Sequence, residues 1–219
     1  MTLLTNWAMY WAEGGLARGF SITLQTFIVA SILTILWGLV VALLRVSPVA
    51  PLRFIAIVYI EIFRGTPLLV QLLTFFAAIP IVTGLQLPPF ETAMVALTLN
   101  AGGYLAESYR SGFQAVPRGQ HEAGMALGLS DLQIFFRITL PLAIRVILPA
   151  IGNTLAGLLL TTPFIFLVGL EDMTAKANQI MNRTADWSVF MLITLIYIAM
   201  GLILVAGNNW LERRYRPLI

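Results

Sequence analysis

The sequence predicts an all-α integral membrane protein with about five transmembrane helices, and three observations support this prediction. Of the 219 residues, 59% are hydrophobic and 11% are charged, and the mean hydropathy is +0.89. Soluble domains carry about 25% charged residues, so this composition excludes an ordinary soluble globule. Several apolar runs exceed about 18 residues, which is typical of membrane-spanning helices. None of these runs alternates apolar and polar residues as the strands of a transmembrane barrel do.

The charge-free runs locate the predicted helices. The spans are expected to form a single domain, residues 1–219, and to cover about residues 21–44, 54–83, 91–112, 141–168 and 187–210. The first run lies between Arg18 and Arg45, and the fourth lies between Arg145 and Glu171. The fifth ends before Glu212. Each run provides the roughly 20 mostly apolar residues that a helix needs to cross the hydrocarbon core.

Basic residues indicate the orientation. If the N-terminus is outside, the cytoplasmic segments contain Arg45, Arg53, Arg118, Arg137, Arg145, Arg213, Arg214 and Arg216. The external segments then contain only Arg18, Lys176 and Arg183. Because cytoplasmic loops carry an excess of Lys and Arg, we expect an external N-terminus and a cytoplasmic C-terminus.

The connection at about residues 115–138 is long, and it has predicted structure of its own. Residues 118–127 are typical of a short helix, which Gly128 and Leu129 end. Ser130-Asp131-Leu132-Gln133 has the Ser-x-x-Gln form of a capping box, which favours the start of a second helix. We therefore expect a short helix, a glycine turn and a capped helix at the inner face of the membrane.

The same loop contains a motif with defined spacing. It reads Glu122-Ala123-Gly124-Met125-Ala126-Leu127-Gly128, then nine residues, then Ile138-Thr139-Leu140-Pro141. This resembles the EAA loop of binding-protein-dependent ABC importers, with Gly124 in place of the second alanine. Tyr59-x-Glu61-x-x-Arg64-Gly65-Thr66-Pro67-Leu68 is similar to the second-span motif of the polar amino acid permease family. The resemblance covers about residues 20–215 and is closest to the histidine, basic amino acid and opine branch.

The resemblance implies the type I ABC importer transmembrane fold and a function. The chain would be the permease subunit of an ATP-driven, binding-protein-dependent importer of polar amino acids or related small zwitterions. It would lie in the bacterial inner membrane and work by alternating access. Its expected partners are a second permease subunit (homologous or identical), two cytoplasmic ATPase subunits, an extracytoplasmic solute-binding protein and lipid. The ATPase subunits would bind ATP and Mg²⁺, because this chain has no Walker-type phosphate loop and no cofactor of its own.

The resemblance also implies which residues couple to the ATPase. They are Glu122, Ala123, Gly124, Gly128 and Leu129. Small residues allow a short helix to lie deep in a groove on a partner, and Glu122 can accept charge-assisted hydrogen bonds there. The alternative is an amphipathic helix that lies on lipid and holds the loop at the interface.

Two charge pairs lie inside predicted spans. Glu61 and Arg64 are three residues apart in the second span, and Glu107 and Arg110 have the same spacing in the third. Intramembrane charges are costly and usually face the interior of the bundle, so the four could meet in one network. The network would be either an inner gate that rearranges during transport or a fixed brace between two helices. Gly65-Thr66-Pro67 would break the second span beside it.

The expected substrate pocket departs from the family pattern. Where many members carry a Lys-Asp-Thr-Ser-Leu-like sequence after the fourth span, this chain has Leu160-Thr161-Thr162-Pro163-Phe164. The lost acid weakens the case for a basic cargo bound by this subunit. A partner subunit that holds the site, a neutral or zwitterionic cargo, and the absence of a membrane site remain open. Candidate pocket residues are Asn100, Thr161 and Thr162.

Other functional classes fit the sequence less well. A secondary transporter or channel that works without an ATPase is the alternative, but such proteins often contain inverted repeats, which are not visible here. An intramembrane enzyme or a metal site would need reactive side chains, whereas the chain has no Cys and a single His121. The scattered basic residues form no basic face for nucleic acid.

Overall fold

The computed structural model describes residues 3–12 and 15–215, and every regular element in those residues is helical. The elements in chain order are α1 (Leu3–Ala12), α2 (Leu16–Arg45), α3 (Ala50–Gly65), α4 (Leu68–Leu73), η1 (Thr74–Ala78), α5 (Ile79–Thr83), α6 (Pro89–Gln114), α7 (Arg118–Ala126), α8 (Asp131–Ile134), η2 (Phe135–Thr139), α9 (Leu140–Thr161), η3 (Thr162–Val168), α10 (Met173–Thr184) and α11 (Ser188–Tyr215). The segments η1 and η2 are π-helical and η3 is a 3₁₀ helix. The all-α prediction is confirmed.

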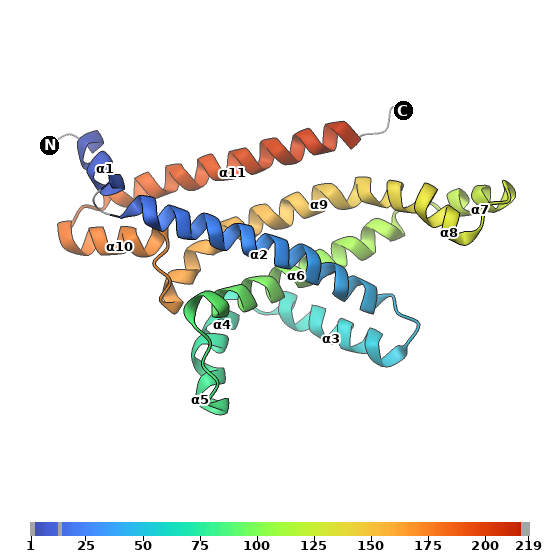
Figure 1. Ribbon diagram of the computed structural model, residues 1–219, viewed down its shortest axis with the longest axis horizontal. Helices are drawn as coiled ribbons and strands as arrows, with labels where there is room; N and C mark the ends of the chain where they lie inside the picture. Colours follow the sequence, from blue (N-terminus) through green and yellow to red (C-terminus); the bar gives the residue numbers. More distant parts are fainter. Residues whose placement is uncertain (1–2, 13–14, 216–219) are drawn as a thin grey trace.

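The long helices lie side by side, and α6 occupies the middle of the bundle (Figure 1). It packs against α2, α3 and α9, and twelve of its 26 residues are buried. Gly38 of α2 and Gly102 of α6 allow a close approach, because a Cβ on Gly38 would lie 3.3 Å from the Gly102 carbonyl oxygen. Small residues at such contacts let membrane helices pack by van der Waals attraction.

Length and composition identify three membrane-crossing helices among the described residues: Leu16–Arg45, Asp131–Val168 and Ser188–Arg214. A fourth is counted if Ala50–Gly65 and Leu68–Thr83 form one span, although they are bent by 106°. The helix over the predicted third span, α6, is long enough but is not apolar enough to be counted. Its neighbours cover much of its surface, so it needs fewer apolar residues than a lipid-facing helix. Length and composition therefore support fewer spans than the five expected.

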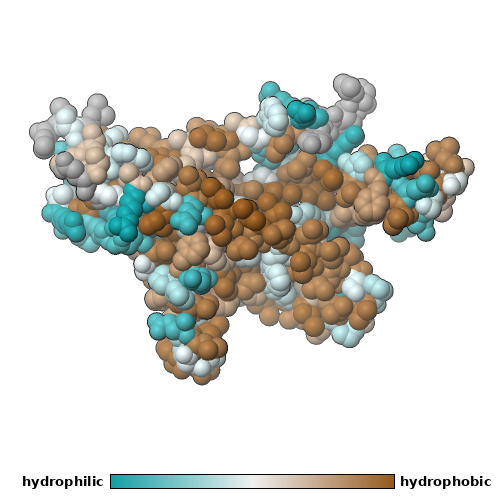
Figure 2. Space-filling model, in the orientation of Figure 1, coloured by the Kyte–Doolittle hydropathy of each residue, from teal (hydrophilic) through white to brown (hydrophobic). Residues whose placement is uncertain are grey.

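The outside of the bundle is largely apolar. Large hydrophobic side chains are exposed along α2 and α11, and brown surface dominates the body of the molecule in Figure 2. Exposed apolar residues of α11 include Met191, Leu195, Ile198, Leu202 and Ile203. This surface is large enough to require a covering of lipid or partner helices.

The two ends of the bundle differ. The C-terminal ends of α2, α6 and α11 point toward α7 and α8 (Figure 1). Helices α1 and α10 lie at the opposite end of the bundle. The segments predicted to be cytoplasmic therefore share one end of the molecule. Arg216, used in the orientation argument, lies outside the described residues.

Candidate functional site

The second predicted span is broken where the sequence predicted. Gly65 ends α3, Thr66 is extended at φ −120° and ψ 144°, and Pro67 precedes α4. Proline has no N–H to continue the helical ladder, and it restricts the residue before it to extended conformations. The break leaves backbone carbonyls without helical partners inside the bundle.

The side chain of Gln71 satisfies these carbonyls. Its Nε2 donates to the Phe63 carbonyl at 3.0 Å, to the Thr66 carbonyl at 3.1 Å and to Thr66 Oγ1 at 2.7 Å. Asn100 Nδ2 donates to the same Phe63 carbonyl at 3.0 Å and to Gln71 Oε1 at 3.2 Å. Asn100 thus joins α6 to the break between α3 and α4. Sequence reasoning missed Gln71, although a glutamine just past a helix-breaking proline was a usable signal.

A cavity of about 620 Å³ opens beside this polar network, and we call it the larger cavity. Asn100 and Thr161, two of the three predicted pocket residues, line it together with Thr66, Tyr104, Asn153 and Thr154. Thr162 is fully buried and donates to the Leu159 carbonyl at 2.8 Å, and it does not line the cavity. The volume lies within the range of small-molecule sites, and mixed polar and apolar walls are typical of them.

A second cavity of about 320 Å³, the smaller cavity, adjoins the larger one. Both are lined by Tyr104, Asn153 and Thr154, and the smaller one adds Arg64 and Glu107. Glu107 follows Asn100 along α6, so the smaller cavity lies toward the end of the bundle that carries α7.

Only one of the two predicted charge pairs forms. Arg110 donates to both carboxylate oxygens of Glu107, with Nε at 2.9 and 3.0 Å, while its Nη1 donates to Gln114 Oε1. Glu61 and Arg64 are both exposed, and neither forms an ion pair among the described residues. The four charges therefore do not form one salt-bridge network.

Arg64 is held instead by an aromatic ring. Its guanidinium carbon lies 5.2 Å from the centroid of the Tyr104 ring, within the range of a cation–π interaction. The Tyr104 hydroxyl donates to the Arg64 carbonyl at 3.3 Å. Tyr104 was not among the predicted site residues, because a lone tyrosine in a span has no sequence signature.

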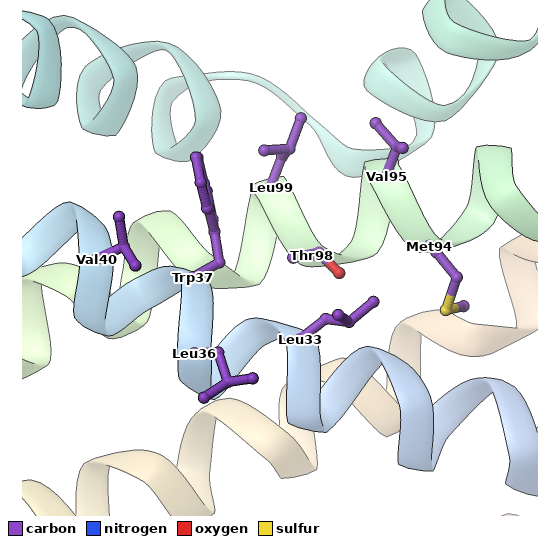
Figure 3. Close-up of a pocket in the computed structure, with 8 residues that line it drawn as sticks. All are labelled: Leu33, Leu36, Trp37, Val40, Met94, Val95, Thr98 and Leu99. Atoms are coloured by element: carbon purple, nitrogen blue, oxygen red, sulfur yellow. The ribbon is translucent and has the colours of Figure 1, made fainter.

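A third hollow, an apolar groove of about 360 Å³, lies between α2 and α6 (Figure 3). Its walls come from Leu33, Leu36, Trp37, Val40, Met94, Val95, Thr98 and Leu99. Only Thr98 and Trp37 carry polar side-chain atoms, and Trp37 Nε1 is already bound to the Tyr59 hydroxyl at 2.8 Å. A polar solute would lose its hydration there without compensation, so this groove is a poor solute site.

The loop predicted to couple to an ATPase forms the expected elements. Helix α7 ends in a turn where Gly128 has φ +74°, and the N–H groups of Gly128 and Leu129 donate to the carbonyls of Met125 and Gly124. This is the Schellman pattern, and glycine is favoured at its left-handed position. Ser130 and Gln133 form both bonds of the predicted capping box.

The predicted coupling residues face different ways. Glu122 and Ala123 are exposed on α7, whereas Gly124 is buried against the chain's own Ile134. A Cβ on Gly124 would lie 2.7 Å from Ile134 Cγ1. We expected Gly124 to enter a partner's groove, and the structure corrects this. The position faces α8 and η2, and their close packing on α7 leaves no room for a side chain there.

The opposite end of the bundle is held by buried polar contacts. Asp172 is fully buried, and its Oδ1 accepts from the N–H of Ala175 at 2.9 Å at the start of α10. Its Oδ2 has no partner among the described residues. Burial raises the pKa of Asp172 to about 6, against the opposing effect of the Ala175 N–H. Nearby, the hydrogen bond from Lys176 holds the pKa of Glu171 below its usual value.

No group of three or more His, Cys, Asp or Glu side chains that could hold a metal ion occurs in the described part of the chain. The polar side chains that line the two cavities carry amides, hydroxyls, the Glu107 carboxylate and the Arg64 guanidinium. Such groups can bind a polar solute through hydrogen bonds.

Comparisons with known proteins agree with this geometry. Residues 15–217 match the family described as binding-protein-dependent transport system inner membrane component. The arginine transport system permease protein ArtQ of Bacillus subtilis (strain 168) is 34% identical over 200 residues, which cover 91% of each chain. The L-cystine transport system permease protein TcyB of the same organism is 36% identical over 204 residues, covering 92% of this chain and 85% of the relative. A crystal structure of an amino acid ABC transporter with histidines superposes with a TM-score of 0.89 at 33% identity, covering 98% of this chain and 99% of the other.

Proposed function

Because the chain belongs to the binding-protein-dependent transport system inner membrane components, we propose that it is the permease subunit of an importer of polar amino acids or related small zwitterions. The observation that carries the cargo class is the likeness to amino acid permeases over nearly the whole chain. The larger cavity supports it, because Asn100 and Thr161 provide polar atoms within the bundle. We place the N-terminus outside and the C-terminus in the cytoplasm, with α6 as a fifth span shielded by its neighbours.

The assembly that we propose follows from the open side of the bundle. A single bundle with exposed apolar faces and open cavities does not enclose a path, so a second permease subunit, homologous or identical, would complete it. Two ATPase subunits would bind ATP and Mg²⁺ at the cytoplasmic end. A solute-binding protein would deliver the cargo outside.

Coupling would run through α7. The exposed Glu122 and Ala123 would face the ATPase, beside the residues Met125 and Leu127, which are 52% and 78% exposed. Gly124 packs on Ile134, and the helical run from Asp131 to Val168 continues from there to the larger cavity. A push on α7 would therefore move the helix that carries Thr161.

Reconstitution tests the proposal. The chain is placed in proteoliposomes with its cognate second permease, ATPase and binding protein, and uptake of radiolabelled amino acids is measured with and without ATP. We expect uptake only with ATP and the ATPase subunits. Uptake that continues without either would favour a secondary transporter or channel.

Charge reversal tests the docking helix. Glu122→Lys should reduce co-purification of the ATPase with the permease, because it replaces the proposed hydrogen-bond acceptor with a cation that would repel the positively charged donors of the ATPase. The matched control, Glu91→Lys, reverses an exposed charge at the start of α6 and should leave co-purification unchanged. Equal loss in both variants, or none in Glu122→Lys, would remove α7 as the docking site.

A further inference from the structure

Arg64 forms no ion pair in the described part of the chain, although it lies in a predicted span and lines the smaller cavity. Glu107 lines the same smaller cavity, but both of its carboxylate oxygens bind Arg110. Glu61 forms no ion pair with any described residue. The guanidinium of Arg64 is therefore bound to no carboxylate among the described residues.

An uncompensated intramembrane arginine is costly unless it lines an aqueous cavity, and such residues usually mark the path of a solute or ion. The Tyr104 ring contacts this guanidinium through a cation–π interaction, which leaves its N–H groups free of a carboxylate. A guanidinium presents paired N–H donors that match a carboxylate, so a preplaced arginine favours this ligand chemistry. Tyr104, which lines both cavities, puts Arg64 at the passage between them.

We propose that Arg64 binds the carboxylate of the cargo as it passes from the larger to the smaller cavity. The inference rests on the proposed importer function and deepens it by naming the recognised group. The Asn153 and Thr154 side chains, which line the same cavity, carry oxygens that would accept from the positive pole of a zwitterion. The cargo class is thus small carboxylate-bearing zwitterions, and amines without a carboxylate are excluded.

The first measurement is ligand binding to the complete, nucleotide-free importer in detergent, without the binding protein. Radiolabelled L-arginine, L-glutamine and L-histidine are each competed with unlabelled amino acid or with the corresponding α-carboxamide. We expect each amide to bind at least about tenfold more weakly, because it cannot form the charged pair. Equal competition by acid and amide would overturn the proposal.

The second measurement uses variants of Arg64 in the same complex. Arg64→Met keeps the length of the side chain and should weaken amino acid binding by at least about tenfold while removing the preference over the amide. Arg64→Lys keeps the charge without the paired donors and should retain part of that preference. The control is Arg53→Met, an exposed arginine at the other end of α3, which should bind as the wild type does.

The outcomes separate the two proposals. If the wild-type importer shows no ATP-dependent amino acid uptake, the proposed function fails. If uptake is present but Arg64→Met keeps the full preference for the acid over the amide, the role of Arg64 fails while the importer function stands. Where Arg64→Met does not assemble, Arg64→Lys is used, and a full preference in that variant has the same meaning.

Discussion

Replacing Gln71 with leucine removes the side chain that satisfies the broken span. Gln71 is 7% exposed, and its amide donates to two carbonyls and one hydroxyl while accepting from Asn100. In Gln71→Leu the Phe63 carbonyl keeps Asn100, but the Thr66 carbonyl loses its amide donor and Asn100 loses one acceptor. Each unsatisfied polar group withdrawn from water costs about 1–3 kcal/mol, and because these two are only partly buried we expect a total loss of about 3 kcal/mol of unfolding free energy.

Thermal unfolding of the detergent-solubilised protein measures this loss. For a chain of this size, about 3 kcal/mol corresponds to a fall in Tm of about 6–12 °C. The control is Thr74→Val, because Thr74 is exposed and its hydroxyl bonds the Val70 carbonyl one turn earlier in the adjoining α4; its Tm should change by about 1–2 °C. A Gln71→Leu variant that melts like Thr74→Val would refute the reasoning.

A double-mutant cycle tests whether Gln71 and Asn100 act together. Their side chains are joined at 3.2 Å and share the Phe63 carbonyl, so the effects of Gln71→Leu and Asn100→Ala should not add. Coupling energies for such contacts are about 0.5–3 kcal/mol. Strict additivity would mean that each amide stabilises the break separately.

Two further predictions concern the end of the bundle that carries α10. Gly19→Ala should destabilise the protein by about 1–3 kcal/mol in thermal melts. The new Cβ would lie 2.8 Å from the Asp172 carbonyl oxygen and 2.9 Å from Met173 Cα, and these backbone atoms cannot rotate away. Gly207→Ala on α11 is the control, since no atom lies within 4 Å of its Cβ position. It should be neutral or stabilising by up to about 1 kcal/mol. Equal destabilisation in both variants would contradict the packing argument. The pKa of Asp172 in the folded state is raised to about 6, so the protonated carboxyl stabilises the fold fully below its ordinary pKa. This stabilisation is lost as the pH rises through 6, and the free energy of unfolding at neutral pH is lower by about 3 kcal/mol. Asp172→Asn retains an N-cap oxygen and should flatten the dependence of Tm on pH between 4 and 7, whereas Glu91→Gln at an exposed site should not; an unchanged slope in Asp172→Asn would show that another group causes it.

Local sequence signals predicted the loop elements well. Gly128 and the Ser130–Gln133 capping box act through hydrogen bonds between residues a few positions apart, so their geometry follows from the residues themselves. The break at Gly65-Thr66-Pro67 was predictable for the same reason, since proline lacks the N–H that a helix needs. Its bend of 106° was not, because the angle depends on the helices packed around it.

The candidate site was predicted in part. Asn100 and Thr161 line the larger cavity, but Gln71 and Tyr104 were missed, and Thr162 faces away. The spacing of Glu61 and Arg64 suggested a pair that does not form, because Tyr104 of another helix provides the contact that Arg64 makes. Spacing shows which residues share a helix face, and only packing shows what that face meets.

The sequence by itself determined the membrane class, the helical character and the family, because each depends on composition, apolar run length or a local motif. The tertiary structure alone decided that Gly124 faces its own chain, that Gln71 bonds the carbonyls at the broken span, and that Arg64 lines the smaller cavity without an ion pair among the described residues. These are contacts between residues distant in sequence, and their energies depend on side-chain directions that only the packed helices establish.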